Sequence, residues 1–212
     1  MNEFTPQQLD QLSNFIRVGS TEASRALSTW LNKDVQVWVE QLQQASLETA
    51  VEQLGPVAEI VCACCMRVSG GINGQLMLGF DDASGLMLCD MLLAQERTSK
   101  EWGEIEISAA METTNIVGCA FLNSLSLVFP KSPELAATSE TPACTTWIPT
   151  PPVFVRDYAA AIMQFALMDQ ASLFDTVLLA QTRFTIDGTP VKWQLLLIPD
   201  AEVIARLAEI LG

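Results

Sequence analysis

The stretch SAAMETTN, at positions 108–115, carries one acid and one amide in an otherwise uncharged run. Glu112 and Asn115 would share one face of a helix, because side chains three or four residues apart lie above one another. An ionised carboxylate accepts hydrogen bonds and pairs with cations, whereas a carboxamide donates and accepts at once. Two interpretations follow: a solvated helix face, which is the commoner case, or a small polar site on a helix otherwise suited to burial.

The polar positions continue along this helix. Positions 108, 112, 115 and 119 step by four, three and four, so one stripe would hold Ser108, Glu112, Asn115 and Cys119. A buried, unpaired Glu112 would cost several kcal/mol or take up a proton, so we expect it to be exposed or paired. The positions expected to face the rest of the fold are Ile105, Ala109, Ile116, Ala120 and Leu127.

Composition narrows the chemistry. The chain has 212 residues, with 11 Lys or Arg, 25 Asp or Glu, no His and a net charge of −14. Without histidine there is no Ser-His-Asp or Cys-His catalysis, and the commonest metal ligand is missing. Nucleic acid is a poor partner, because phosphate binding needs clusters of Lys and Arg and these are dispersed.

Three of the six cysteines, Cys62, Cys64 and Cys65, stand close together in EIVCACCMRV. A zinc site would need four ligands, usually from paired knuckles, and no second knuckle follows. The continuous apolar run is typical of a buried strand, in which free cysteine packs as a small hydrophobic residue. We therefore favour packing and expect no metal site.

The location of the protein is suggested by two stretches. The beginning, MNEFTPQQLDQ, lacks the basic start and apolar core of a signal peptide, which predicts a cytoplasmic protein with reduced cysteines. The longest uncharged run, 113–130, contains polar residues and a glycine. It is more typical of a buried helix than of a membrane span.

An internal duplication organises the chain. Residues 59–95 and 176–212 each show the pattern strand, turn, strand, amphipathic helix, with SGGING and DGTP as the turns. A long helix is predicted before each hairpin, at about 6–31 and 102–129. The sequence therefore predicts one domain over 1–212, built from half-repeats at about 6–100 and 101–212.

The remaining segments complete the predicted architecture. The alternating DVQVWVE at 34–40 predicts a half-buried strand. In the second half we expect a loop at 130–142, a strand at 144–149 and a helix opened by proline at 151–168. The predicted fold class is α/β (α+β), with a mixed, largely antiparallel sheet of about six strands shared by both halves and covered by long helices.

These residues resemble a known family. LSNFIRVGSTEASRALSTWLNKDVQVWV is similar to the opening helix and strand of the CheC/CheX/FliY family of chemotaxis phosphatases. SAAMETTNIVGCAFLNSLS is similar to its second signature helix, Asp/Ser, three residues, Glu, two residues, Asn, and IPTPPVFVRDYAAAIM to the segment that follows. The resemblance spans about residues 9–212, and it implies a CheC-like fold with hairpins exchanged between the halves.

The resemblance implies dephosphorylation of CheY-like response regulators. Their aspartyl phosphate is already an activated acyl phosphate, so the enzyme mainly places a water in line with phosphorus. Asn115 would hold that water, and Glu112 would pair with the receiver's lysine, with Ser108 and Cys119 as neighbouring binding positions. The protein would need no cofactor of its own, since the Mg²⁺ would belong to the receiver.

The first half carries a degenerate copy of the motif. Asp10, Asn14 and Arg17 stand where the second half has Ser108, Glu112 and Asn115. A guanidinium only donates hydrogen bonds, so Arg17 does not replace the amide, and one active site, in the second half, is expected. The stretch 130–142 also alters the proline spacing of the second signature.

A second functional hypothesis comes from a different class. A chain with this fold and one degenerate half would also serve as a non-catalytic adaptor that binds a receiver, a CheD-type deamidase or a flagellar-switch component. The acidic surface permits either function, because net charge influences association without identifying the partner. Phosphatase and adaptor are therefore both carried forward.

Overall fold

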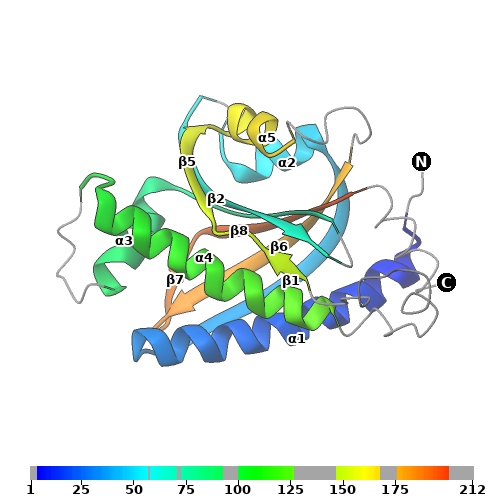
Figure 1. Cartoon of the computed structure of the whole chain (residues 1–212), viewed down its shortest axis with the longest axis horizontal. Helices are drawn as coiled ribbons and strands as arrows, with labels where there is room; N and C mark the ends of the chain where they lie inside the picture. The colour runs from blue at the N-terminus through cyan, green and yellow to red at the C-terminus, as the bar shows by residue number, and fades with distance from the viewer. Residues whose placement is uncertain are drawn as a thin grey trace, which may run out of the picture.

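The computed structural model describes residues 4–56, 58–70, 73–92, 100–126, 147–167 and 176–200. A curved sheet runs through the molecule, with α1 and α4 on one face and α2 and α5 on the other (Figure 1). The helices are α1 (Pro6–Leu31), α2 (Leu47–Leu54), α3 (Asp82–Leu92), α4 (Glu104–Leu125) and α5 (Ala159–Leu167). The strands are β1 (Val35–Ser46), β2 (Ile60–Ser69), β3 (Gly74–Phe80), β4 (Ile148–Pro149), β5 (Val153–Tyr158), β6 (Thr176–Ile186), β7 (Thr189–Val191) and β8 (Trp193–Pro199).

In the described residues the sheet has eight strands, in the order β1-β6-β8-β3-β2-β4, with β5 also pairing β2 and β7 pairing β6. All of these pairings are antiparallel. The α+β class and the antiparallel sheet are confirmed. The expected number of about six strands is too low, because β5 was predicted as part of a helix and β7 was not anticipated.

The two halves of the chain are interleaved in this sheet. β1 pairs with β6 of the second half, and β2 pairs with β5 of the second half. The two hairpins, β2–β3 and β6–β8, meet where β3 pairs with β8. Strands are thus exchanged between halves, and neither half has a complete sheet by itself.

The alternation of side chains along β2 creates two core layers. Cys62, Cys64 and Met66 belong to the layer under α1 and α4, whereas Ala63 and Cys65 belong to the layer under α2 and α5. The interpretation of EIVCACCMRV as a buried strand is confirmed. Burial raises the pKa of the Cys64 and Cys65 thiols to about 12, so both stay protonated.

Helix α1 is fixed at both ends and along one side. Thr5 caps its start in a capping box with Gln8, and Asn32 ends it in the left-handed conformation, with φ 50°. The hydroxyl of Ser28 accepts from the Val35 N–H at 3.0 Å and donates to the Val35 carbonyl at 3.1 Å. Backbone groups on the outer edge of β1 are satisfied in this way, which holds α1 against the sheet.

Helices α1 and α4 lie antiparallel and cross at Gly19 (Figure 1). A Cβ at Gly19 would stand 2.5 Å from Ser124 Oγ and 2.9 Å from Phe121 Cα. This approach requires a residue without a side chain. On its other side α4 approaches β2 at Gly118, where a Cβ would stand 2.7 Å from Met66 Sδ.

Part of the second half differs from the prediction. The helix predicted at 151–168 is wrong over 153–158, which form β5 at the edge of β2, and α5 begins only at Ala159. The two prolines therefore precede a strand, and β-branched Val153 and Val155 suit its pleat. The predicted strand at 144–149 is reduced to β4, while 144–146 lie outside the described residues.

Other boundaries shift as well. Helix α2 was missed, and α4 occupies 104–125 of the predicted 102–129. The loop at 130–142, part of the SGGING turn and the final helix lie outside the described residues. Of the helices in the described part of the chain, none is both long and apolar enough to cross a membrane.

The crossing at Gly19 makes a testable claim about stability. Gly19→Ala should lower the free energy of unfolding by about 1–3 kcal/mol, because the new methyl meets the α4 backbone, which does not yield easily. Gly118→Ala is the matched control and should cost less, since its neighbour is the flexible end of Met66. Urea unfolding followed by circular dichroism measures both. Equal costs would contradict the proposed crossing.

Candidate functional site

The polar stripe lies on the outer side of α4. Ser108 and Glu112 are exposed, while Asn115 and Cys119 are half-buried. The helix begins after Gly103, whose N–H donates to Glu106 Oε2 at 3.1 Å, and acids in its first turn suit the helix dipole. The expectation that Glu112 is exposed is met, and the four side chains face outward together.

The buried side of α4 differs from the predicted one. Ile105, expected to face the fold, is 60% exposed, and Leu127 lies outside the described residues. The buried positions include Ala110, Val117 and Phe121. The periodicity located the polar stripe, and Ala120 is buried as expected. Thr113 and Thr114, which the prediction assigned to neither face, are buried as well, so the buried face lies part of a turn from the predicted one.

The two buried threonines have satisfied hydroxyl groups. Thr113 and Thr114 donate to the carbonyls of Ala109 and Ala110, each at 2.9 Å, so their hydroxyls are satisfied within the helix. A threonine bonded in this way presents its methyl group to the core. The side chains on the face of α4 opposite the stripe are therefore smaller and more polar than those on the buried face of a leucine-rich helix. Their small size lets α4 lie close to both α1 and β2.

The carboxamide of Asn115 keeps most of its hydrogen-bonding capacity. Its Oδ1 accepts a weak bond from Cys119 Sγ at 3.7 Å. Within the described residues its amide nitrogen has no partner, and Glu112 makes neither a hydrogen bond nor an ion pair. Burial and the charge of Glu112 raise the pKa of the Cys119 thiol. Cys119 is thus a neutral neighbour that steadies the amide, and it is poorly suited to act as a nucleophile.

Asn115 stands between two grooves. The first, here called the α1–α4 groove, has a volume of about 650 Å³ and is lined from α1 by Val18, Glu22, Arg25 and Ala26 and from α4 by Asn115, Ile116, Cys119, Ala120, Asn123 and Ser124. The second, here called the proline groove, has a volume of about 380 Å³ and is lined by Ser108, Met111, Glu112, Asn115, Pro149, Thr150, Pro151 and Pro152. An incoming protein segment on either side of the ridge would contact the amide.

The proline groove is a feature that sequence reasoning missed. The stretch 130–142 lengthens the chain between Asn115 and the prolines at 149–152, so spacing alone placed none of these beside the amide. The structure nevertheless brings 149–152 beside Glu112 and Asn115. The signal was present in the cluster of three prolines within four residues, which favours a stiff extended segment.

One carboxylate connects the residue just before α4 with the strand that follows the prolines of the groove. Asp82, in the first turn of α3, accepts from Trp102 Nε1 at 2.8 Å and from Arg156 Nε at 3.0 Å, and its Oδ2 pairs with Arg156 Nη2 at 2.6 Å. Trp102 lies just before α4, and Arg156 lies on β5, shortly after the prolines. The Arg156 guanidinium is the main reason that the pKa of Asp82 lies well below its usual range.

Aromatic packing reinforces this connection. The rings of Trp102 and Phe154 have centroids 4.8 Å apart, and Phe80 lies 5.8 Å from Trp102 and 5.1 Å from Trp193. Phe80 and Trp193 are buried in the core layer under α4. The start of α4 is therefore held by a polar anchor at the surface and an aromatic cluster beneath it.

The degenerate positions lie apart from this site. Asp10, Asn14 and Arg17 are exposed on α1, and Arg17 Nη1 donates to Asn14 Oδ1 at 3.4 Å. None of the three lines either groove beside Asn115. Among the described residues, no group of three or more His, Cys, Asp or Glu side chains is arranged to hold a metal ion.

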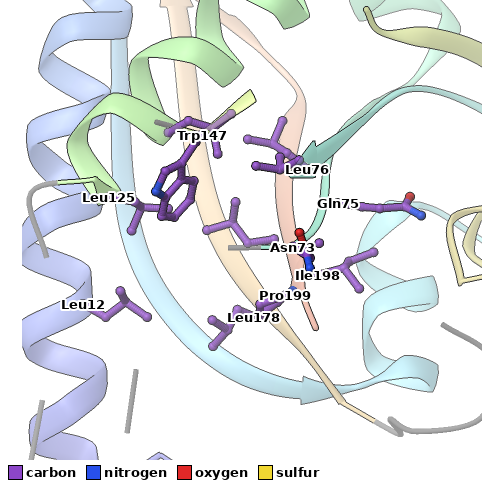
Figure 2. Close-up of a pocket in the computed structure, with 13 residues that line it drawn as sticks. Leu12, Asn73, Gln75, Leu76, Leu125, Trp147, Leu178, Ile198 and Pro199 are labelled. Atoms are coloured by element: carbon purple, nitrogen blue, oxygen red, sulfur yellow. The ribbon is translucent and has the colours of Figure 1, made fainter. Parts of the chain in front are cut away.

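A separate cavity lies under the C-terminal end of α4. Figure 2 shows the indole of Trp147 beside Leu125, with Leu12 and Leu178 on the opposite walls. Its volume is about 40 Å³ and nearly all of its lining is apolar. Leu122 and Leu125, which line it, follow Asn115 by two turns or more, so it is not part of the stripe.

Comparison with known proteins identifies the fold. Neither a protein-family model nor a curated protein sequence matches the chain. FliY of Thermotoga maritima superposes with a TM-score of 0.69 at 16% identity, covering 98% of this chain and 97% of that one. FliM from H. pylori, in a complex with FliG, gives 0.67 at 12% identity, covering 95% and 99%, and the FliM middle domain from H. pylori gives 0.64 at 11% identity, covering 97% and 99%.

These likenesses concern the fold. The chain has the fold shared by FliY and the FliM middle domain, and the expected CheC/CheX/FliY-type fold is confirmed. A fold by itself does not imply a function, so function has to be argued from the side chains on α4.

The Asp82 anchor makes a prediction about pH. Because its folded-state pKa is depressed, the carboxylate stabilises the fold above the unfolded aspartate value near 3.9, and that contribution is lost as pH falls through the folded value. Asp82→Asn should lower the free energy of unfolding by about 1–2 kcal/mol at pH 7, with a difference that shrinks below about pH 4. Urea unfolding across this range measures it.

The control for Asp82 is Glu40→Gln, which removes the partner of Arg183 in an exposed ion pair. It should change stability by no more than about 1 kcal/mol at any pH, because exposed pairs are screened by solvent. The prediction is wrong if the difference in free energy of unfolding between wild type and Asp82→Asn stays constant down to pH 3. It is also wrong if that difference merely equals the one measured for the control.

Proposed function

We propose that the protein is a phosphatase for aspartyl-phosphorylated CheY-like receiver domains, with Asn115 as the catalytic residue and Glu112 as the docking residue. The observation that carries the proposal is the arrangement on α4. A carboxamide with a free amide group stands on an exposed ridge between two grooves, one turn from a carboxylate that has no partner in the described residues. The FliY-like fold supports it.

The chemistry asked of Asn115 is modest. In an aspartyl phosphate the leaving group is a carboxylate, so a water needs chiefly to be held in line with phosphorus and to be relieved of bulk solvent. The amide nitrogen would donate a hydrogen bond to a phosphoryl oxygen, while Oδ1 would accept one from the water. The second bond fixes the direction in which the lone pair of the water points. A histidine-based catalyst, which this chain lacks, is not required.

The role proposed for Glu112 is charge pairing. Its carboxylate lies one turn before Asn115 on the same face, and it would meet a lysine beside the receiver's phosphoryl group. An ion pair at this place fixes the rotation of the receiver about the ridge, and thereby the position of the amide. Mg²⁺ would enter with the receiver, and the proposed substrate implies a cytoplasmic location.

The grooves on either side of the ridge would receive the loops that surround a receiver's active site. The proline groove offers a stiff wall, because 149–152 contain three prolines and are followed by the anchored strand β5. With such a wall, a receiver would dock in one orientation without first ordering a flexible segment. Ordering such a segment would lower the affinity. Ser108, which also lines this groove, would bind the receiver's backbone.

The adaptor hypothesis retains one specific support. FliM shares the fold, and one of its solved structures is a complex with FliG. In that case the present chain would bind a partner through α1 or α4 without turnover. The intact Glu112 and Asn115 pair favours the phosphatase, because an adaptor has no need for an unpartnered amide beside an unpaired carboxylate.

The direct test is the decay of phosphorylated receiver, taken from the CheY-like receivers of the same organism. The wild-type protein should accelerate phosphate loss, and Asn115→Ala should reduce the rate constant at saturation by about 100-fold or more. Asn14→Ala, which removes an exposed amide from the degenerate half, is the control and should leave the rate unchanged. If wild type gives no acceleration, the adaptor hypothesis replaces this one.

Glu112 should show a different kinetic signature. Glu112→Gln should raise KM by about tenfold with little change in kcat, because it weakens docking and leaves the water-positioning amide in place. Steady-state phosphate release at several receiver concentrations separates the two constants. A fall in kcat at unchanged KM would mean that Glu112 takes part in the chemical step instead.

A further inference from the structure

We infer that Arg25 of α1 is a substrate-binding residue of this site, whose guanidinium contacts the phosphoryl group of a docked receiver from the side opposite Glu112. The inference rests on the proposed function and goes beyond it, because it assigns a role to the helix that carries the degenerate motif. Arg25 and Asn115 line the same groove, Arg25 from α1 and Asn115 from α4.

The helix crossing fixes their relative level. Gly19 contacts Phe121, and the two helices run antiparallel (Figure 1). Six residues along α1 from Gly19 lead to Arg25, and six residues back along α4 from Phe121 lead to Asn115. Both steps correspond to about 9 Å of helix, so the arginine and the amide stand at the same level on the two walls of the groove.

Arg25 is held at the groove by a bond that is easily exchanged. Its Nη2 pairs with Glu22 Oε2 at 2.6 Å, one turn earlier on the same helix, and both line the groove. The Arg25 side chain is 78% exposed, and ion pairs at that exposure are weak. A phosphoryl group would compete well for the guanidinium, whose planar fork of donors matches phosphate oxygens.

The charge distribution supplies the reason for this arginine. The protein carries a net charge of −14, and an aspartyl phosphate is itself anionic. Among the described residues that line the two grooves, the charged ones are Glu22, Arg25 and Glu112, so Arg25 is the single cation. The positive charge of Arg25 would offset, at the point where the phosphoryl group enters, the repulsion between this anionic group and the negatively charged protein.

Arg17 shows that position matters more than charge. It lies on the same exposed helix, but it is bonded to Asn14 and lines neither groove. Arg17→Ala therefore removes the same charge from the same helix at a place that would not meet the phosphoryl group. The pair of arginines offers a matched comparison within the intact protein.

The test measures binding to a CheY-like receiver of the same organism, both unmodified and loaded with BeF₃⁻ and Mg²⁺ as a phosphoryl analogue. Arg25→Ala should weaken binding of the loaded form by about tenfold and leave the unmodified form unchanged. Arg25→Lys should recover part of the loss. Arg17→Ala should stay within about twofold for both forms. Thermal unfolding of each variant confirms that the fold is retained.

Several outcomes would overturn the inference. It is wrong if Arg25→Ala binds the loaded receiver like wild type, if it weakens both forms equally, or if Arg17→Ala has the same effect. These outcomes leave the phosphatase proposal standing when wild type accelerates phosphate loss and Asn115→Ala does not. Conversely, wild type that binds the loaded receiver without hydrolysis, and loses this binding with Arg25→Ala, would retain the inference and remove the phosphatase. A wild-type protein that binds neither form would remove both.

Discussion

The close approach of α1 to α4 at Gly19 is the contact that determines what the rest of the molecule presents to solvent. It presses α4 between a neighbouring helix and the sheet, with Gly19 admitting Phe121 and Ser124 on one side and Gly118 admitting Met66 on another. Only one narrow side of α4 is left uncovered, and that side carries the polar stripe. The same contact creates the α1–α4 groove, because two helices that touch at one level diverge from it at another. The exposure of Asn115 is therefore a consequence of packing elsewhere along the helix.

Interleaving of the halves makes this arrangement rigid. β1 and β5 each complete the sheet of the other half, so α1 and α4 are both attached to a framework that neither could build alone. The Asp82 anchor works in the same way, since it joins α3 of the first half to Trp102 and Arg156 of the second. A duplicated fold of this kind can lose one of its two polar motifs without loss of structure, because Asp10, Asn14 and Arg17 are exposed and contribute little to the core.

Local patterns were sufficient for much of the fold. The helix predicted at about 6–31 matches α1, and turn residues between alternating apolar runs located both hairpins. Helical spacing alone also placed the stripe on one face of α4. What failed depended on distant parts of the chain: VFVRDY became a strand because β2 offers it an edge, and 149–152 reached Asn115 through sheet pairing. The level of Arg25 relative to Asn115 likewise follows from a helix crossing, which no local spacing encodes.

The proposed chemistry suits a chain that has no histidine. Hydrolysis of an acyl phosphate asks for orientation more than for proton transfer, so an amide can do what other hydrolases assign to an imidazole. The main energetic contribution of the protein is then the binding of the receiver, through Glu112 and the two grooves. A phosphatase and an adaptor with this fold would differ chiefly in the carboxamide of Asn115. This is also why the fold alone does not decide the function: FliY and the FliM middle domain both share it with this chain, so the side chains on α4 have to carry the argument. In this chain α4 presents the acid and the amide, and Arg25 of the neighbouring helix lines the α1–α4 groove together with the amide.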